Sequence, residues 1–419
     1  MGKKVIVIGG GAAGMMAAGQ AAVHGSEVVL IEKMKRLGSK IAISGKGRCN
    51  LTNAGDIADF ISYYPGNGKF LFASLKEFDN QALIGFFKGY GVKTKIERGA
   101  RVFPEADDSE VIVNALKQFL GDAGVKVILG QTAGRVITED QKVRGLELKL
   151  SHEVLPADAV IVATGGASFP RTGSAGDGYA IAEELGHKVI HPLPALVPVR
   201  TLEQWPEQLQ GLTLKNVNAS IWVEGKKKAE EFGEMLFTHF GISGPIILTL
   251  SRTASHALSV GQNVEIRIDL KPALSYEQLD LRLQRDFEKY QNKQFKNALE
   301  DLLPKSMIPV IVALSQIHPE KAIHQVSKTE RTRLCRLLKE LLLHITGTLG
   351  MGAAIVTSGG IDVKQINPST MESRLIRGLF WAGEVIDIDG VTGGYNLQAA
   401  FSTGFKAGKA AAHYVRTAV

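Results

Sequence analysis

The sequence of 419 residues contains only two cysteines, Cys49 and Cys335, and they lie far apart. Neither has a second cysteine or a histidine at metal-ligand spacing, so the sequence predicts neither a disulfide framework nor a metal site. An uninterrupted apolar run of about 18 residues, which a membrane-spanning helix needs, is also missing. We therefore expect a reduced, soluble, cytoplasmic protein that has no membrane partner.

The composition excludes an unfolded or fibrous protein, because 45% of the residues are hydrophobic and only 22% are charged. The 46 glycines exceed the average share of roughly 7%, and together with many Val, Ile and Ala residues they favour α/β structure with tight turns. A net charge of +7 fits a slightly cationic soluble enzyme, or one with an anionic partner such as a nucleotide cofactor or RNA.

The first 32 residues carry the pattern of a strand, a helix and a second strand. Residues 5–8 and 28–31 are apolar runs typical of buried parallel strands, and residues 12–24 favour a helix. Gly9, Gly11 and Gly14 lie between the first strand and the helix in the order G-x-G-x-x-G. The pattern predicts a Rossmann-type dinucleotide-binding domain of the α/β class.

Each position in this motif has a physical task. Gly9 permits the tight turn, Gly11 lets the backbone approach a pyrophosphate, and Gly14 permits close helix packing. The first N–H groups of the helix are available to the anion. Glu32, at the end of the second strand, is expected to accept hydrogen bonds from a ribose 2′-hydroxyl. The alternative is that the glycines only turn the chain.

Three features favour FAD over NAD. Three consecutive glycines before Ala-Ala-Gly are similar to the FAD version of the motif. The apolar run 159–163 with the glycines after it resembles the second FAD motif of two-dinucleotide-binding flavoproteins, and residues 378–384 resemble the third. Residues 393–398 then open a helix whose N–H groups are expected to face the flavin or the pyrophosphate. Motifs in this order predict noncovalently bound FAD.

A loop at residues 43–53 has a composition suited to enclosing an anionic cofactor, since it combines glycines, cations and asparagines. Lys46 and Arg48 are expected to neutralise phosphate, or else to be surface charges. The predicted FAD-contacting residues are Gly9, Gly11, Ala12, Ala13, Gly14, Glu32, Lys33, Lys40, Ser44, Gly45, Lys46, Gly47, Arg48, Asn50, Ala163, Thr164, Gly165, Gly166, Gly383, Glu384, Gly394, Tyr395, Asn396 and Leu397.

Two residues are candidates for catalytic proton transfer. Cys49 beside the flavin would protonate one carbon of a C=C bond while the flavin delivers hydride to the other, although a lone cysteine is more often a small buried apolar residue. His239 precedes a helix that Ser243 is expected to cap and Pro245 to begin, so it either faces a cleft or belongs to a hinge. For Tyr395, contact with the flavin and plain packing are both open.

The sequence pattern changes along the rest of the chain. Residues 1–192 form the first part of the expected FAD-binding domain, residues 193–270 alternate as half-exposed strands do, residues 271–346 favour helices, and residues 347–419 return to the first domain. The helical insert is basic, and its cations either follow a phosphate backbone such as that of RNA or form a solvated face. These cations include Arg331, Arg333, Arg336 and Lys339.

No second nucleotide fingerprint is recognisable, because Gly350 and Gly352 precede an expected strand rather than follow one. A dedicated NAD(P)H domain is therefore not expected. If NADH or NADPH is the electron donor, it has to reach the flavin through the substrate cleft, which implies a ping-pong scheme.

These motifs together resemble a known family, the bacterial YhiN/BaiN-type flavoproteins, described as aminoacetone-oxidase-like or NAD(FAD)-utilising dehydrogenases. The resemblance covers essentially the whole chain and rests on residues 9–14, 44–53, 238–245 and 382–398. It implies an FAD Rossmann domain interrupted by a β-barrel-like insert and a helical insert. It also implies redox chemistry, but it names no substrate because members of the family differ in function.

We therefore expect an FAD-dependent oxidoreductase that exchanges hydride with a small organic substrate. The preferred reaction is reduction of an activated C=C bond with a nicotinamide donor. The alternatives are amine oxidation by oxygen, reduction of a base in RNA, and a flavin-binding protein without catalysis.

Overall fold

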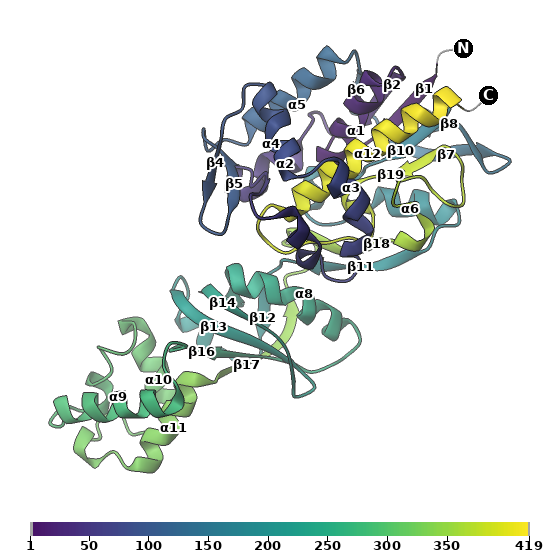
Figure 1. Ribbon diagram of the computed structural model, residues 1–419. Coiled ribbons are helices and arrows are strands. Elements are labelled where there is room, and N and C mark those ends of the chain that lie inside the picture. The colour runs from purple at the N-terminus through teal and green to yellow at the C-terminus, as the bar shows by residue number, and fades with distance from the viewer. Residues whose placement is uncertain (1–2, 418–419) are drawn as a thin grey trace. The chain divides into compact units, whose positions relative to one another are not determined.

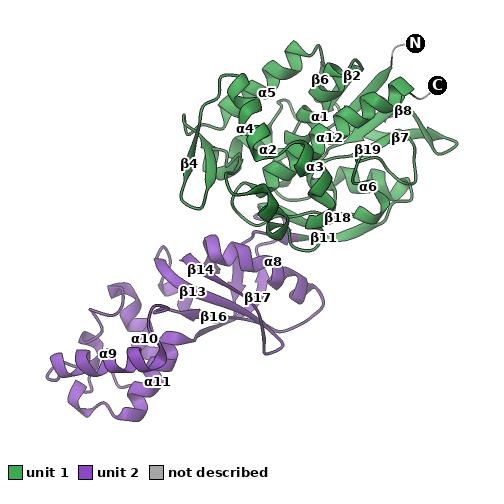
Figure 2. Cartoon of the chain, in the orientation of Figure 1, with its two compact units in different colours: residues 1–193, 355–419 green, residues 194–354 purple. Residues whose placement is uncertain are grey.

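The computed structural model describes residues 3–417, which form two compact units. Unit 1 extends to residue 193 and resumes at residue 355, and unit 2 comprises residues 194–354 (Figure 2). Each unit has its own hydrophobic core. The chain therefore leaves the first unit once, builds the second, and returns.

Unit 1 is built around a parallel sheet of five strands in the order β19-β10-β1-β2-β6 (Figure 1). The strands are short apolar runs with both faces covered, as parallel sheets require, and β1 lies in the middle. Their bounds are β1 Lys4–Ile8, β2 Glu27–Glu32, β6 Lys126–Leu129, β10 Ala159–Val162 and β19 Leu379–Trp381. The expected Rossmann-type α/β fold is confirmed.

Helices α1 (Ala12–Val23) and α12 (Tyr395–Thr417) pack with almost no space between their backbones. A Cβ placed on Gly404 of α12 would lie 2.3 Å from the carbonyl oxygen of Ala13, and one on Gly408 would lie 2.2 Å from that of Ala17. The C-terminal helix is thereby fixed directly against the helix that follows the first glycine motif.

The remaining elements of unit 1 surround this core (Figure 1). Short antiparallel sheets join β3 with β5 and β4, and β7 with β8 and β9, while β11 pairs with β18. The bounds are α2 Ser39–Ile43, β3 Thr52–Asn53, α3 Phe72–Glu77, α4 Asn80–Gly89, β4 Thr94–Glu97, β5 Arg101–Pro104, α5 Glu110–Asp122, β7 Ala133–Glu139, β8 Lys142–Leu148, β9 Val154–Pro156, α6 Asp177–Glu184, β11 Val189–Ala195 and β18 Val356–Ile361.

Unit 2 contains a closed six-stranded barrel in the order β12-β15-β14-β13-β16-β17, with a helical part. The barrel strands alternate buried and exposed residues, which is the pattern of a sheet with one face in the core. The bounds are β12 Val199–Thr201, α7 Trp205–Gln208, β13 Thr213–Val223, β14 Lys226–Thr238, β15 Gly241–Ser243, α8 Pro245–Ser259, β16 Val264–Asp269, α9 Tyr276–Lys289, α10 Ile308–Ser315, α11 Lys328–Lys339 and β17 Leu341–Thr348. Among residues 3–417, no helix combines the length and the apolar character that crossing a membrane demands.

The structure differs from the expected boundaries at the end of the helical insert. Helices were expected as far as residue 346, but α11 ends at Lys339 and the chain at once enters β17, which closes the barrel. In β17, Leu341, Leu343 and Ile345 are buried and the residues between them are exposed, a period of two that the leucine-rich composition conceals. The return to unit 1 falls at residue 355 instead of 347.

His187, just after α6, gives unit 1 a pH-sensitive group. It is buried, with Nε2 2.8 Å from Ser373 Oγ and its ring edge-on to Trp381. Burial lowers the pKa of the imidazole, so the unfolded chain takes up a proton at a higher pH, near 6.5, than the native chain does. The free energy of unfolding therefore falls as the pH drops below about 6.5.

For wild-type apoprotein we expect the free energy of unfolding to fall between about pH 7.5 and about pH 5.5. In His187→Gln this fall should be smaller, by up to roughly 1 kcal/mol. Urea denaturation at the two pH values measures the difference. Equal losses in both proteins would show that His187 does not contribute to the acid sensitivity.

Candidate cofactor site and active site

The turn between β1 and α1 leaves an open, uncapped helix end. A Cβ on Gly9, whose φ is +106°, would lie 2.4 Å from the carbonyl oxygen of Ala163, and one on Gly14 would lie 1.8 Å from that of Gly9. A Cβ on Gly11, in contrast, would meet nothing within 4 Å, and no side chain caps the helix there. The free N–H groups and the space above Gly11 fit a pyrophosphate.

Glu32 ends β2 beside this turn, as predicted for a residue that binds ribose. Its Oε2 accepts a hydrogen bond from Gly10 N at 2.6 Å, and its Oε1 accepts one from Met34 N at 2.7 Å. A carboxylate has about four acceptor positions. Two remain for ribose hydroxyls, so the geometry fits the adenosine end of FAD.

The second and third predicted motifs lie against the first. Ala163, at the end of β10, adjoins Gly9, and a Cβ on Gly383 would lie 2.8 Å from the Cβ of Ala13 at the start of α1. Gly383 N also donates a hydrogen bond to Thr403 Oγ1 of α12 at 3.0 Å. Segments separated by hundreds of residues thus border one helix end, where a single dinucleotide can contact all of them.

A polar network links these motifs through Glu384. Lys40 Nζ of α2 lies 2.7 Å from both Glu384 Oε2 and Ser168 Oγ. Glu384 Oε1 accepts hydrogen bonds from Ser168 Oγ at 2.9 Å and from Thr357 N at 2.8 Å. Glu384, predicted to lie near the ribityl chain, is therefore held mainly by protein donors. In the second motif, a Cβ on Gly166 would lie 2.4 Å from Thr357 Oγ1.

The loop after α2 has an unusual backbone. Gly45, Lys46 and Gly47 all have φ between +57° and +84°, and Lys46 is exposed. Ser44 Oγ donates a hydrogen bond to Ile41 O at 2.8 Å. With its amide oxygen toward Gly394, Asn50 accepts a hydrogen bond from Gly394 N at 3.0 Å. The loop therefore connects to the C-terminal motif, and only Lys46 presents a free charge to solvent.

Arg48 is paired with protein carboxylates. Its guanidinium lies 2.8 Å from Glu97 Oε1 and 3.3 Å from Asp107 Oδ1, and 4.2 Å above the ring of Phe103. Glu97 at the end of β4 and Asp107 just after β5 already balance its charge. Arg48 therefore anchors the loop to the β4–β5 hairpin.

Lys33, another predicted cofactor residue, also has a protein partner. Its ammonium pairs with Asp177 in the first turn of α6. A Cβ on Gly173 would lie 3.0 Å from Met34 Cγ. Lys33 thus joins the end of β2 to the segment that follows the second motif.

The loop before α12 is closed by its own side chains. Asn396 accepts a hydrogen bond from Gly390 N and donates one to Gly390 O, both at 2.8 Å. Tyr395 is buried and stacks on Tyr63 with ring centroids 4.3 Å apart, and Leu397 is partly buried. A Cβ on Gly394, whose φ is +97°, would lie 2.3 Å from Thr52 O. Asn396 and Tyr395 therefore shape the loop.

The two candidate proton donors belong to different units. Cys49 in unit 1 is completely buried, its φ is +59°, and burial raises the pKa of its thiol to about 12. His239 in unit 2 is exposed in the turn between β14 and β15, beside Phe240. Ser243 lies in β15 and does not cap α8; Gly244 occupies that position, and Pro245 begins the helix as predicted.

Some cations of the helical insert are paired with acids. Arg331 Nε lies 2.8 Å from Asp280 Oδ1, Lys339 Nζ lies 2.5 Å from Asp269 Oδ2, and Arg333 donates to Gln316. Arg336 is exposed on α11. The local positive charge is thus partly neutralised within the insert itself.

Some residues of the site carry no recognisable sequence motif. Ser168 and Thr357 are fully buried at the centre of the Glu384 network, yet both are small polar residues that no motif marks. Thr52 Oγ1 donates to Gln398 Oε1 at 2.6 Å, and Asn53 Nδ2 donates to Gly393 O at 3.1 Å. Thr52 and Asn53 lie in the run 44–53, and Gly393 and Gln398 lie in the run 393–398. Both runs were singled out from the sequence, but the contacts between them were not predicted.

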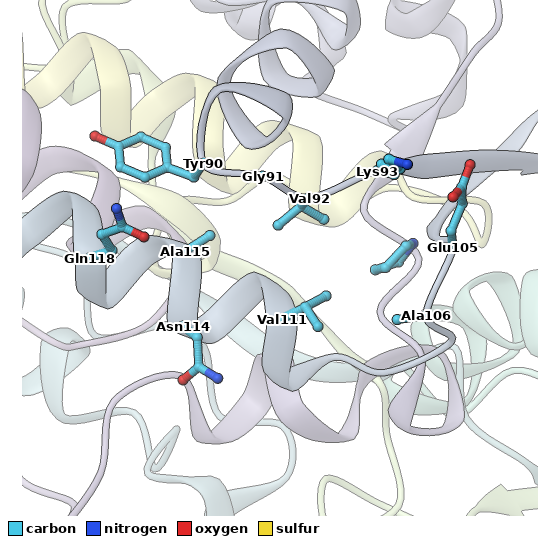
Figure 3. A pocket seen from close by; sticks show the side chains of 11 residues that line it. Tyr90, Gly91, Val92, Lys93, Glu105, Ala106, Val111, Asn114, Ala115 and Gln118 are labelled. Atoms are coloured by element: carbon cyan, nitrogen blue, oxygen red, sulfur yellow. The ribbon is translucent and has the colours of Figure 1, made fainter.

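A separate cavity of about 490 Å³ lies between the end of α4, β5 and α5 in unit 1 (Figure 3). Tyr90, Lys93, Glu105, Asn114 and Gln118 are its polar lining residues. None of the predicted cofactor residues lines it, so it is distinct from the dinucleotide site.

The open helix end, the glycine turn and the converging motifs define the dinucleotide-binding domain of a flavoprotein. A protein-family model described as the HI0933-like protein Rossmann domain matches residues 3–410. The chain belongs to this family, and it is an FAD-dependent oxidoreductase. The resemblance to YhiN/BaiN-type flavoproteins is thereby confirmed.

Relatives with named activities align over nearly the whole chain. A 3-dehydro-bile acid delta(4,6)-reductase of Clostridium scindens is 32% identical over 98% of this chain and 99% of its own length. A ribosomal RNA dihydrouridine synthase of Haemophilus influenzae is also 32% identical, over 96% of each chain. A 3-ketosteroid delta1-dehydrogenase of Sterolibacterium denitrificans is 13% identical, with a TM-score of 0.53 over 98% of this chain and 100% of its own, and it shares the fold.

Proposed function

We propose that this protein reduces a C=C bond conjugated to a carbonyl group in a small organic substrate, with NADH or NADPH as the electron donor. The observation that carries the reaction type is that two relatives of equal identity are both named for saturating such a bond, in a 3-oxo bile acid or in uridine. The proposal takes from these relatives only the shared reaction, reduction of a conjugated C=C bond, and neither of their substrates.

The residues of unit 1 fit this chemistry by holding and orienting FAD. The N–H groups at the start of α1 would bind the pyrophosphate, Glu32 would bind the ribose, and the loops at residues 44–50 and 390–397 would enclose the remainder. Bound FAD supplies a ring that accepts hydride from the donor and passes it to the substrate. The protein then has to supply a proton to the neighbouring carbon.

His239 is the more accessible of the two candidate donors, and a general acid has to reach its substrate. Its imidazole is exposed, whereas Cys49 has no exposed surface. Histidine is also the side chain that most often serves as a general acid. The proposal therefore assigns proton donation to His239 and packing to Cys49.

We expect His239→Asn to slow reoxidation of the reduced enzyme by substrate about 100-fold and to leave flavin reduction by the nicotinamide unchanged. Cys49→Ala should slow neither step more than about threefold. Stopped-flow absorbance separates the two half-reactions. If Cys49→Ala slowed substrate reduction strongly and His239→Asn did not, Cys49 would be the proton donor and His239 would not.

The proposed reaction is tested by anaerobic reduction of the FAD-loaded protein with NADH and NADPH, followed by a panel of conjugated ketones that includes a 3-oxo-4,6-diene steroid. We expect the flavin absorbance to bleach and to return with substrate, and the product to carry two additional hydrogens. Reoxidation only by oxygen, in the presence of an amine donor, would support amine oxidation instead. A flavin that no donor bleaches would indicate a protein without catalysis.

Reduction of a base in RNA is the second candidate, supported by the dihydrouridine synthase relative. Ion pairs such as Arg331–Asp280 and Lys339–Asp269 weigh against it, because they reduce the positive charge that the insert offers to a phosphate backbone. Binding of ribosomal RNA fragments at low and moderate salt, with analysis for dihydrouridine, decides the question. A steep loss of affinity with salt, together with dihydrouridine formation, would favour RNA over a small molecule.

A further inference from the structure

A charged pair adjoins the dinucleotide site and joins the motifs that form it. A Cβ on Gly383 would lie 2.8 Å from the Cβ of Ala13, and a Cβ on Gly166 would lie 3.0 Å from Glu384 Oε1, so Glu384 borders both the second and the third motif. We propose that Lys40 and Glu384 together set the reduction potential of the flavin, as charge-positioning residues. The inference rests on the flavin chemistry of the proposed function and is independent of its substrate.

The hydrogen bonds of the pair support this role. Lys40 uses two of its three N–H donors, on Glu384 and on Ser168. Its side chain is 28% exposed, so the third donor, which has no partner among residues 3–417, borders space open to a ligand. Thr357 N and Ser168 Oγ hold the carboxylate from the other side. Both charges are therefore held in position by protein partners.

The electrostatic consequence follows from the sign of each charge. Reduction adds electrons to the flavin, so a nearby cation favours the reduced state and a nearby anion favours the oxidised state. Partly enclosed charges are screened less than exposed ones. The potential reports the ratio of the protein's affinities for the two states, and a tenfold change in that ratio is a shift of about 30 mV for two electrons.

The test is the midpoint potential of the FAD-loaded protein, measured against indicator dyes, in three variants. Lys40→Met should lower the potential by about 30 mV or more, the shift that accompanies a tenfold change in the affinity ratio. Glu384→Gln should raise it by a similar amount. The double variant should return toward the wild-type value, because the two charges are removed together. A merely structural network would not give shifts of opposite sign.

Further variants keep the experiment decisive. Lys40→Arg retains the positive charge, so its midpoint potential should stay near that of wild type. If Glu384→Gln does not fold, the comparison of Lys40→Arg with Lys40→Met still isolates the effect of the charge. Glu147→Gln makes the same charge change at the exposed Arg135–Glu147 pair and should leave the potential unchanged. Shifts of the same sign, or no shift in Lys40→Met, would overturn the inference. Opposite shifts in a protein that reduces no conjugated ketone would uphold it and reject only the proposed substrate class.

Discussion

The Gly11→Asp variant should fold normally and lose FAD. The backbone of Gly11, at φ −86° and ψ −169°, suits any residue, and a Cβ there meets nothing within 4 Å. Asp is also a favourable N-cap residue, so its carboxylate would occupy the free N–H groups of α1. That position is the one a pyrophosphate needs. We expect the dissociation constant of FAD to rise at least about 100-fold, a loss of roughly 2.7 kcal/mol.

Fluorescence titration of the apoprotein with FAD measures this loss, and thermal unfolding of the apoprotein provides the control. The apoprotein midpoint should stay equal to wild type or rise slightly, because the new cap stabilises α1. Gly14→Ala is the contrasting variant, since its Cβ would lie 1.8 Å from Gly9 O and would unfold the turn itself. If Gly11→Asp bound FAD as wild type does, the assignment of this helix end to the pyrophosphate would be wrong.

The features predicted correctly from the sequence are those specified by neighbouring residues. The β1–α1–β2 unit depends on an apolar run, a glycine turn and a helical stretch within about 30 residues, and the structure contains this unit. The interruption by a strand-rich and a helical segment was also visible as a change of pattern. Local chemistry is sufficient for such features.

The features that the sequence did not predict depend on partners distant in the chain. Arg48 lies in a loop suited to binding phosphate, but Glu97 and Asp107, about 50 and 60 residues further on, pair with it. In β17 the barrel context overrides the helical composition of a leucine-rich run. The Glu384 network requires Lys40, Ser168 and Thr357 to meet in space. No local pattern contains that information.

Gly404→Ala should be strongly destabilising although alanine is the better helix former. Its Cβ would lie 2.3 Å from Ala13 O, so α12 would have to move away from α1. Overpacking of this kind costs about 1–3 kcal/mol, and a second such contact exists at Gly408. Because Ala13 also touches Gly383, the displacement should spread to the dinucleotide site. We expect the double variant Gly404→Ala, Gly408→Ala to lose roughly 3–5 kcal/mol and most of its FAD affinity.

Gly85→Ala is the matched control, because the same substitution there has the opposite consequence. Gly85 lies in α4, it is exposed, and a Cβ on it would meet nothing within 4 Å. Removing glycine's conformational freedom at such a position stabilises a helix by about 0.5–1 kcal/mol. Urea denaturation of the apoproteins compares the variants. Stabilisation by alanine at both 404 and 85 would mean that α1 and α12 are not in backbone contact, and the shared site at their ends would lose its structural basis.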